Sequence, residues 1–251
     1  MGASPCGFKS HLRHIYMPKR RLPFKEFTWT PELAYVIGLI VTDGNLSKDG
    51  RHINIRSSDV DLLKTFQSIL NLNAKIAQSH NNGFAKKPSY RIQFSDVQFY
   101  NWLISIGITP AKTHTIGKVK TPEKYFRDFL RGHLDGDGTI FTYIDNYNHY
   151  RGRTYTNQRI FTKFISASQL HITWLHNKIK ELAPVNGALI CNNPTRPNRV
   201  PMWEIKFSKY ESLKLFKWLY YDKNLPTLKR KRQIAEDLLR HVVNNKLIRL
   251  I

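Results

Sequence analysis

Two segments of the chain share one pattern of apolar and polar positions. Each begins with Thr-Pro-Glu, continues with apolar residues at helical spacing and ends in Asp-Gly, over residues 30–44 and 121–138. Threonine is a good N-cap, proline fits the first helical position, and glutamate suits the positive end of a helix dipole. The pattern predicts helices over 31–43 and 122–137.

The similarity continues downstream of both helices. In each half an alternating stretch reaches a serine, Ser57 or Ser166, and then leads into an amphipathic helix. A second alternating stretch, starting at Tyr90 or Trp203, leads into another helix. The copies are offset by 94 residues, from Asp43 to Asp137, which is too long for a solenoid repeat. We therefore expect an α+β fold made of two related halves, each ordered αββαββα.

The repeat sets the expected domain boundaries. We expect a basic N-terminal arm over 1–28, a first half over 29–116, a second half over 117–240 and a C-terminal tail over 241–251. The linker is expected within 113–121, just before Pro122. The arm and the basic stretch after Pro226 have two interpretations, a solvated charged surface or a contact with phosphate.

Small residues recur on one face of both predicted helices. Gly38 and Gly132 occupy matching places, although glycine inside a helix costs roughly 1 kcal/mol relative to alanine. Ala34 and Thr42 extend the small face in the first helix, and Gly136 extends it in the second. Because small residues let two backbones approach, we expect these two helices to pack directly against each other.

The charge of the chain favours a polyanionic partner. There are 40 Lys+Arg against 18 Asp+Glu, a formal net charge of +22, and nucleic acid is the first candidate. No apolar run is long enough to span a membrane, so we expect no membrane association. Two cysteines far apart form no disulfide framework, and no secretory signal is visible, so we expect an intracellular protein.

Two aspartates end the predicted helices. If the helices pack side by side, Asp43 and Asp137 converge at two negative helix ends, and this concentration of charge favours a hard divalent cation such as Mg²⁺. Such a site could activate water and stabilise the leaving oxygen of a phosphodiester. Asp135 has no counterpart in the first copy, where Val41 stands, and we expect it to be a structural hydrogen-bond acceptor. An EF-hand loop is excluded because its glycine and glutamate positions hold Ile140 and Asn146.

The segments "VIGLIVTDG" (36–44) and "LRGHLDGDG" (130–138) resemble the two motifs of LAGLIDADG homing endonucleases. The third-place glycine and the final Asp-Gly match in both copies, whereas Val41, Arg131 and His133 depart from the pattern. The resemblance implies a monomeric, pseudo-two-fold enzyme whose two antiparallel sheets form a saddle on DNA. It implies a metal-dependent double-strand break with short 3′ overhangs in a long, pseudo-palindromic target.

The resemblance also implies roles for individual residues. Asp43 and Asp137 would bind Mg²⁺ or another divalent cation such as Mn²⁺, and Lys112 and Lys231 are the catalytic lysine candidates, with Lys229 as an alternative to Lys231. The resemblance also implies an intron-encoded protein, and the expected location is a bacterial cytoplasm or an organelle matrix. The strands would read double-stranded DNA, because arginine can pair with guanine and glutamine with adenine. The expected DNA-binding residues are Lys48, Arg51, Arg56, Lys86, Lys87, Arg91, Gln93, Arg151, Arg153, Arg159, Lys163, Arg196, Arg199 and Lys206.

Two other functions remain open from the sequence. One is an RNA-binding maturase that acts on its host intron, a role that this family's fold is known to serve. The other is a cleavage-inactive DNA-binding protein with the same fold, which the presence of both motif aspartates disfavours.

Overall fold

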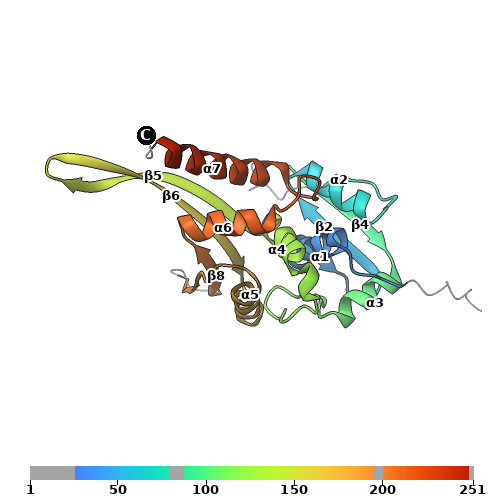
Figure 1. Ribbon diagram of the computed structural model, residues 1–251. Coiled ribbons are helices and arrows are strands. Elements are labelled where there is room, and N and C mark those ends of the chain that lie inside the picture. Colours follow the sequence, from blue (N-terminus) through green and yellow to red (C-terminus); the bar gives the residue numbers. More distant parts are fainter. Residues whose placement is uncertain (1–25, 80–87, 195–199, 249–251) are drawn as a thin grey trace, which may run out of the picture.

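The structure is a computed structural model that describes residues 26–79, 88–194 and 200–248 (Figure 1). The expected arm over 1–28 therefore lies almost entirely outside the described residues. The first half consists of α1 (Pro31–Asp43), β1 (Gly44–Leu46), β2 (His52–Ser57), α2 (Val60–Ile69), β3 (Ala77–Ser79), β4 (Ser89–Ser95) and α3 (Val97–Ser105). The second consists of a 3₁₀ turn (Glu123–Tyr125), α4 (Phe126–Asp135), β5 (Thr139–Tyr150), β6 (Arg153–Ser166), α5 (Gln169–Leu182), β7 (Ala188–Asn192), β8 (Met202–Phe207) and α6 (Lys209–Leu219). A last helix, α7 (Lys229–Ile248), follows and runs into the residues expected to form the tail.

Both halves have the predicted αββαββα order, and their sheets are equivalent. The strand orders are β1-β2-β4-β3 and β5-β6-β8-β7, and all neighbouring strands are antiparallel. Local turns repeat as well, since the hydroxyl oxygen of Ser57 accepts the N–H of Asp59, and that of Ser166 accepts the N–H of Ser168. The predicted α+β duplication is thus confirmed.

The helices α1 and α4 lie side by side between the two sheets (Figure 1). A Cβ on Gly38 would lie 2.7 Å from the backbone nitrogen of His133, and one on Gly132 would lie 2.9 Å from the carbonyl carbon of Tyr35. No side chain fits between the two backbones at these positions. The predicted helix contact is therefore confirmed, and the glycines are what permits it.

The start and end of the second motif helix differ from the prediction. Thr30 caps α1 as expected, with its hydroxyl accepting the N–H of Leu33 at 3.1 Å. The matching hydroxyl of Thr121 is buried and has no hydrogen-bond partner among the described residues, because a 3₁₀ turn precedes α4. At the other end α4 stops at Asp135, so Asp137 lies two residues beyond the helix rather than closing it. Gly136, with ψ −98°, breaks the helix before it reaches Asp137.

The hairpin β5–β6 is much longer than its counterpart β1–β2 and projects from the body of the molecule (Figure 1). Its turn is at Arg151 and Gly152, which both have positive φ, as in a type I′ turn. A β-bulge interrupts the pairing between Asp145 and Asn148. The helix α7 packs beside this hairpin through a small apolar cluster that includes Ile160 and Leu238.

Candidate active site

The two motif carboxylates meet where α1 and α4 end. Asp43 is the last residue of α1 and is half-buried, and Asp137 follows the end of α4 and is exposed. A Cβ on Gly136 would lie 2.9 Å from the Oδ2 atom of Asp43, so this carboxylate rests against the backbone that leads into Asp137. The glycine thus lets the two helix ends bring their acids together.

The surroundings disfavour the charged form of both acids. Desolvation, followed by the negative charge of Asp137, raises the pKa of Asp43 to about 7. Desolvation also raises the pKa of Asp137, while Lys112 and Lys231 lower it. Because burial and mutual repulsion both oppose the charged forms, a divalent cation placed between the two carboxylates would stabilise both.

Two lysines reach this centre from opposite halves, and both are buried although lysine is normally exposed. Lys112 donates from its ammonium to the carbonyl oxygen of Gly44 at 2.5 Å, and Lys231 donates to four carbonyl oxygens around the end of α4. Desolvation lowers the pKa of each lysine to about 8, while the nearby aspartates raise it. The sequence alternative Lys229 is exposed and lines a groove on α7.

Asp135 is a buried hydrogen-bond acceptor, as expected. Its Oδ2 atom accepts the Tyr35 hydroxyl at 2.9 Å and the Leu228 N–H at 2.7 Å. Desolvation by burial raises the pKa of Asp135 to about 6. The carboxyl group therefore connects α1, α4 and the start of α7.

The two residues that depart from the motif in α4 are explained by partners distant in sequence. Arg131 is fully buried, pairs with Asp128 at 2.8 Å and donates to the carbonyl oxygens of Leu219 and Pro226. It thereby holds the loop that leads to Lys231. Sequence reasoning missed this role because both carbonyl groups lie about 90 residues away and belong to the backbone.

His133 forms a buried pair with His171. The two Nε2 atoms are 3.2 Å apart, the rings stack, and Nδ1 of His171 lies 2.8 Å from the carbonyl oxygen of Gly117. A carbonyl oxygen requires a donor, so Nδ1 of His171 carries a proton, its Nε2 accepts, and Nε2 of His133 donates. The pair ties α4 and α5 to the linker, and it lines a cavity of about 460 Å³ together with Lys112 and Asp137.

The two motif carboxylates fit a metal ion that takes its remaining ligands from water and from the phosphates of a substrate. Among the described residues, no group of three or more His, Cys, Asp or Glu side chains is placed to hold a metal ion. Mg²⁺ keeps several waters and is commonly bound by one or two carboxylates plus substrate phosphates. Asp43 and Asp137, which are two carboxylates brought together from the two halves, match this mode.

The open face of the first sheet is polar and basic. Ile53, Ile55 and Ile92 are buried on the helix side, so the alternate residues face outward. Arg56 lies directly opposite Arg91, and this pairing of like charges favours an anion between them. Gln93 lies on the same face.

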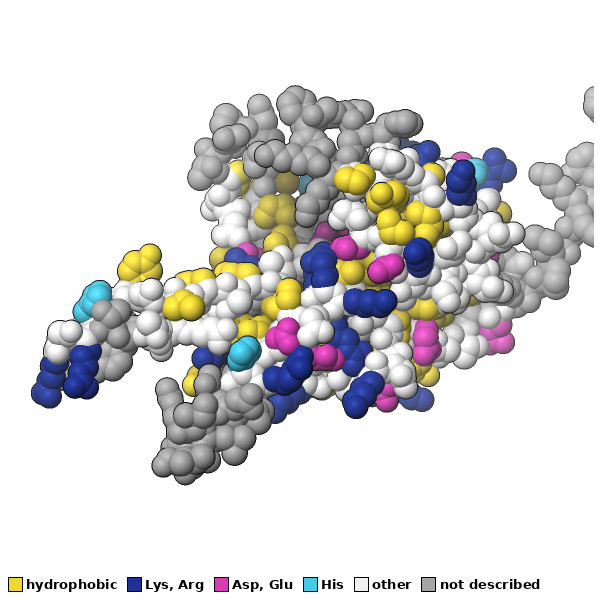
Figure 2. Space-filling view, turned by 90° about the horizontal axis from the view of Figure 1, so that it is seen from above, with side chains coloured by type: hydrophobic (Ala, Val, Ile, Leu, Met, Phe, Trp, Pro, Cys, Tyr) yellow, Lys and Arg dark blue, Asp and Glu magenta, His cyan; other side chains and the backbone are white. Residues whose placement is uncertain are grey.

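The second sheet brings together three of the expected cations on its open face. Lys163 lies directly opposite Lys206, and Arg159 lies further along β6. Lys163 pairs with Glu204 at 2.9 Å and Arg159 with Asp145 at 2.7 Å, so acids partly neutralise this face. Figure 2 shows Lys and Arg side chains at the free end of the hairpin, where Arg151 lies in the turn and Arg153 begins β6.

The other expected DNA contacts lie in loops. Lys48 and Arg51 are exposed in the turn between β1 and β2, and Arg51 lies 3.7 Å from Asp49. Lys86, Lys87, Arg196 and Arg199 lie outside the described residues.

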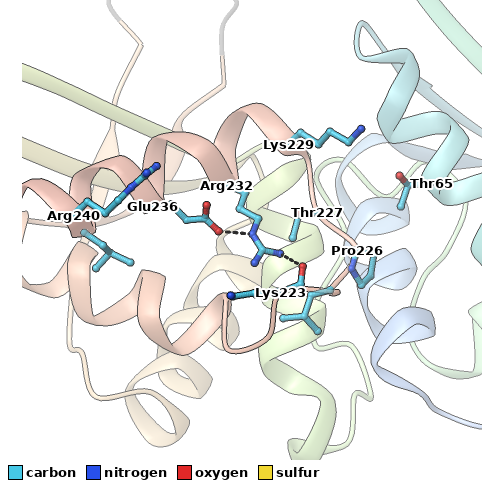
Figure 3. Close-up of a pocket in the computed structure, with 10 residues that line it drawn as sticks. Thr65, Lys223, Pro226, Thr227, Lys229, Arg232, Glu236 and Arg240 are labelled. Atoms are coloured by element: carbon cyan, nitrogen blue, oxygen red, sulfur yellow. Dashed lines mark hydrogen bonds and ion pairs between the residues drawn. The ribbon is translucent and has the colours of Figure 1, made fainter.

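A groove of about 950 Å³ lies away from the carboxylates, between α2, α7 and the loop before α7 (Figure 3). Arg232 crosses it, pairing with Glu236 at 2.7 Å and donating to the carbonyl oxygens of Lys223 and Asp222. On the neighbouring turn, Arg230 pairs with Asp59 of the first half at 3.0 Å. These contacts fix the first turns of α7, which carry Lys231.

Comparison with known proteins defines the class to which this architecture belongs. Residues 30–100 match the model of the LAGLIDADG-like domain, while the second motif lies beyond the matched residues. The first half is thus similar to a LAGLIDADG-like domain, and the chain has the two-domain fold seen in LAGLIDADG homing endonucleases. A comparison with curated proteins finds no match. No helix in the described part of the chain is long and apolar enough to cross a membrane.

Solved structures similar to this chain include two endonucleases bound to DNA. The I-LtrWI LAGLIDADG homing endonuclease bound to target DNA has a TM-score of 0.52 at 14% identity, covering 83% of this chain and 88% of its own. The I-SmaMI LAGLIDADG homing endonuclease bound to cleaved DNA has a TM-score of 0.55 at 11% identity, and the match covers 87% of this chain and 91% of the endonuclease chain. DUF199/WhiA from Thermatoga maritima has a TM-score of 0.50 at 13% identity, and the match covers 90% of this chain and 68% of the DUF199/WhiA chain. At these identities the likeness shows the fold alone.

Proposed function

We propose that this protein is a site-specific, divalent-metal-dependent DNA endonuclease of the homing type. The observation that carries the proposal is the convergence of Asp43 and Asp137, one from each half, with two buried lysines. Two endonucleases with this fold were solved on DNA, which supports double-stranded DNA as the substrate. The expected product is a double-strand break with short 3′ overhangs in a long, pseudo-palindromic target.

The chemistry would be hydrolysis of one phosphodiester in each strand. A water oxygen forms a bond to phosphorus while the bond from phosphorus to one sugar oxygen breaks. The water gives up a proton to solvent, and the departing sugar oxygen gains one. When bound, Mg²⁺ or Mn²⁺ would lower the pKa of the water and neutralise developing charge. Asp43 and Asp137 would hold the metal, and a buried lysine ammonium beside them would stabilise charge at the phosphate.

The two sheets would hold the duplex over this centre. Arg56, Arg91 and Gln93 on the first sheet and Lys163 and Lys206 on the second are the proposed sheet contacts. The remaining proposed contacts are Lys48, Arg51, Arg151, Arg153, Arg159, and, outside the described residues, Lys86, Lys87, Arg196 and Arg199. Phosphate contacts of this number predict binding that weakens steeply with salt.

A second candidate is a nucleic-acid-binding protein without cleavage. DUF199/WhiA has a similar fold, so the fold alone does not establish cleavage. The chemistry of the centre does not require this alternative, since both acids and both lysines are in place.

A randomised DNA library incubated with the protein and Mg²⁺ tests the proposal. We expect one family of targets to be cut in both strands, with no cutting in EDTA. Asp43→Asn and Asp137→Asn should each slow cutting roughly 1,000-fold, since metal chemistry supplies several kcal/mol, and should keep DNA affinity within about threefold. Asp61→Asn, on the exposed surface of α2, is the matched control and should cut normally. Cleavage that survives both active-site substitutions would contradict the metal assignment, and tighter binding of an intron RNA than of any DNA would favour the maturase function.

A further inference from the structure

The end of α4 and the start of α7 bind each other through two opposite charges. Asp135, the last residue of α4, accepts the N–H of Leu228 at the positive N-terminus of α7. In return, Lys231 of α7 places its ammonium at the negative C-terminus of α4. Each charge thus lies at the helix end whose dipole it complements.

The ammonium of Lys231 has no donor left for another partner. It donates to the carbonyl oxygens of Leu134 and Gly138 at 2.6 Å, of Asp135 at 2.9 Å and of Gly136 at 3.2 Å. An ammonium has three N–H groups, and four oxygens already surround this one. These are mostly the carbonyl groups that a helix end leaves without partners.

Lys112 is placed differently. Among the described residues its ammonium has one hydrogen-bond acceptor, the carbonyl oxygen of Gly44, which leaves two N–H groups. It lines the 460 Å³ cavity together with Asp137. The preceding residue, Ala111, has φ +53°, a strained conformation for alanine that is often associated with functional sites.

We propose that the two lysines have different tasks. Lys231 is a positioning residue that, with Asp135, clamps α4 to α7 and shapes the exit that carries Asp137. Lys112 is the catalytic residue of the pair, because it has N–H groups left over and lines the cavity beside Asp137. The assignment of Lys112 rests on the proposed nuclease function, whereas the clamp does not.

The contacts around Lys231 support the clamp. Arg230 fixes the same turn of α7 to Asp59, and Arg232 fixes it to the loop before the helix. Tyr35 adds α1 to the assembly through Asp135. Since Lys231 has no N–H group left for substrate, only the lysine of the first half can contact a phosphate. We therefore expect the two DNA strands to be cut at different rates.

Hydrogen exchange measured by mass spectrometry on the full chain, without DNA or metal, tests the clamp. We expect Lys231→Met to increase exchange at least roughly tenfold in 132–138 and 228–233, and Lys231→Arg, which can still donate to several carbonyl groups, to preserve protection. Lys112→Met should leave both segments protected. If Lys231→Met does not fold, Lys231→Gln replaces it with the same expectation. Unchanged exchange in the Met or Gln variant would overturn the clamp.

Strand-resolved cleavage of a selected DNA target, labelled on each strand, tests the division of tasks. Lys231→Arg should cut both strands within about fivefold of the parent rate. Lys112→Met should slow at least one strand roughly 100-fold, the usual effect of removing one transition-state donor, with unchanged DNA affinity. Loss of cutting in Lys231→Arg with normal exchange would overturn the proposal. A parent protein that cuts no DNA would refute the nuclease function and with it the Lys112 role, while the exchange result would still decide the clamp.

Discussion

Gly38 decides how closely the two halves approach. A Cβ at this position would overlap the carbonyl oxygen of Phe129 and lie 2.9 Å from the carbonyl carbon of Gly132, and both are backbone atoms that cannot move aside alone. We expect Gly38→Ala to lower the free energy of unfolding by roughly 2–4 kcal/mol, although alanine is the better helix former. Urea denaturation measures this.

Gly117→Ala is the control, because a Cβ there would meet no atom within 4 Å. It should leave stability unchanged or raise it by up to about 1 kcal/mol. Equal stability of the two variants would show that the helices separate at little cost.

The buried His133–His171 pair gives stability a dependence on pH. Desolvation lowers the pKa of His171 to about 4 in the folded protein, against about 6.5 when unfolded. As pH falls below about 6.5 the unfolded chain takes up the proton first, so stability is lost progressively until pH reaches about 4. His171→Asn keeps a donor for the Gly117 carbonyl and removes this titration.

We expect the parent to lose about 2–3 kcal/mol more than His171→Asn between pH 7 and pH 4 in urea denaturation. The raised pKa values of Asp43 and Asp135 act in the opposite direction but are common to both proteins. If the free energies of unfolding of the parent and of His171→Asn fall in parallel with pH, the two histidines are not held in their neutral forms.

Among the elements, α1 could be predicted to the residue and α4 could not. The pattern around Thr30 is local, and the cap it predicts forms. The end of α4 depends on Gly136, on Lys231 and on the loop held by Arg131, which are brought together only by the tertiary fold. For the same reason the family resemblance could suggest Lys112 and Lys231 as residues near the aspartates, but their different hydrogen bonding required coordinates.

The β5–β6 hairpin is the element that reaches furthest from the centre. We expect Arg151→Ala/Arg153→Ala to weaken DNA binding and to reduce the salt dependence of log Kd by about two units of slope, as for two phosphate contacts. Cutting of DNA that is already bound should persist. Fluorescence anisotropy at several salt concentrations measures the slope.

Lys214→Ala/Lys217→Ala is the matched control, since both lysines are exposed on α6, which covers the other side of the sheet. It removes the same charge and should change the slope much less. Equal slopes in the two double variants would assign the effect to net charge rather than to the hairpin.

At the scale of the whole molecule, one chain supplies both carboxylates and both lysines. A second copy would add nothing to the centre, so we expect a monomer of 29.4 kDa, free and on DNA. Sedimentation equilibrium with and without a target duplex measures this. A dimer that forms only on DNA would indicate that one saddle does not cover the target.

The unequal lengths of the two hairpins make the two ends of the molecule different. β1 has 3 residues and β5 has 12, so the two ends of the molecule are not interchangeable. A protein with two equal ends would bind its target equally well after a half-turn, whereas this one would distinguish left from right. In the proposed function, sequence changes at one end of the DNA target would therefore be tolerated better than changes at the other end.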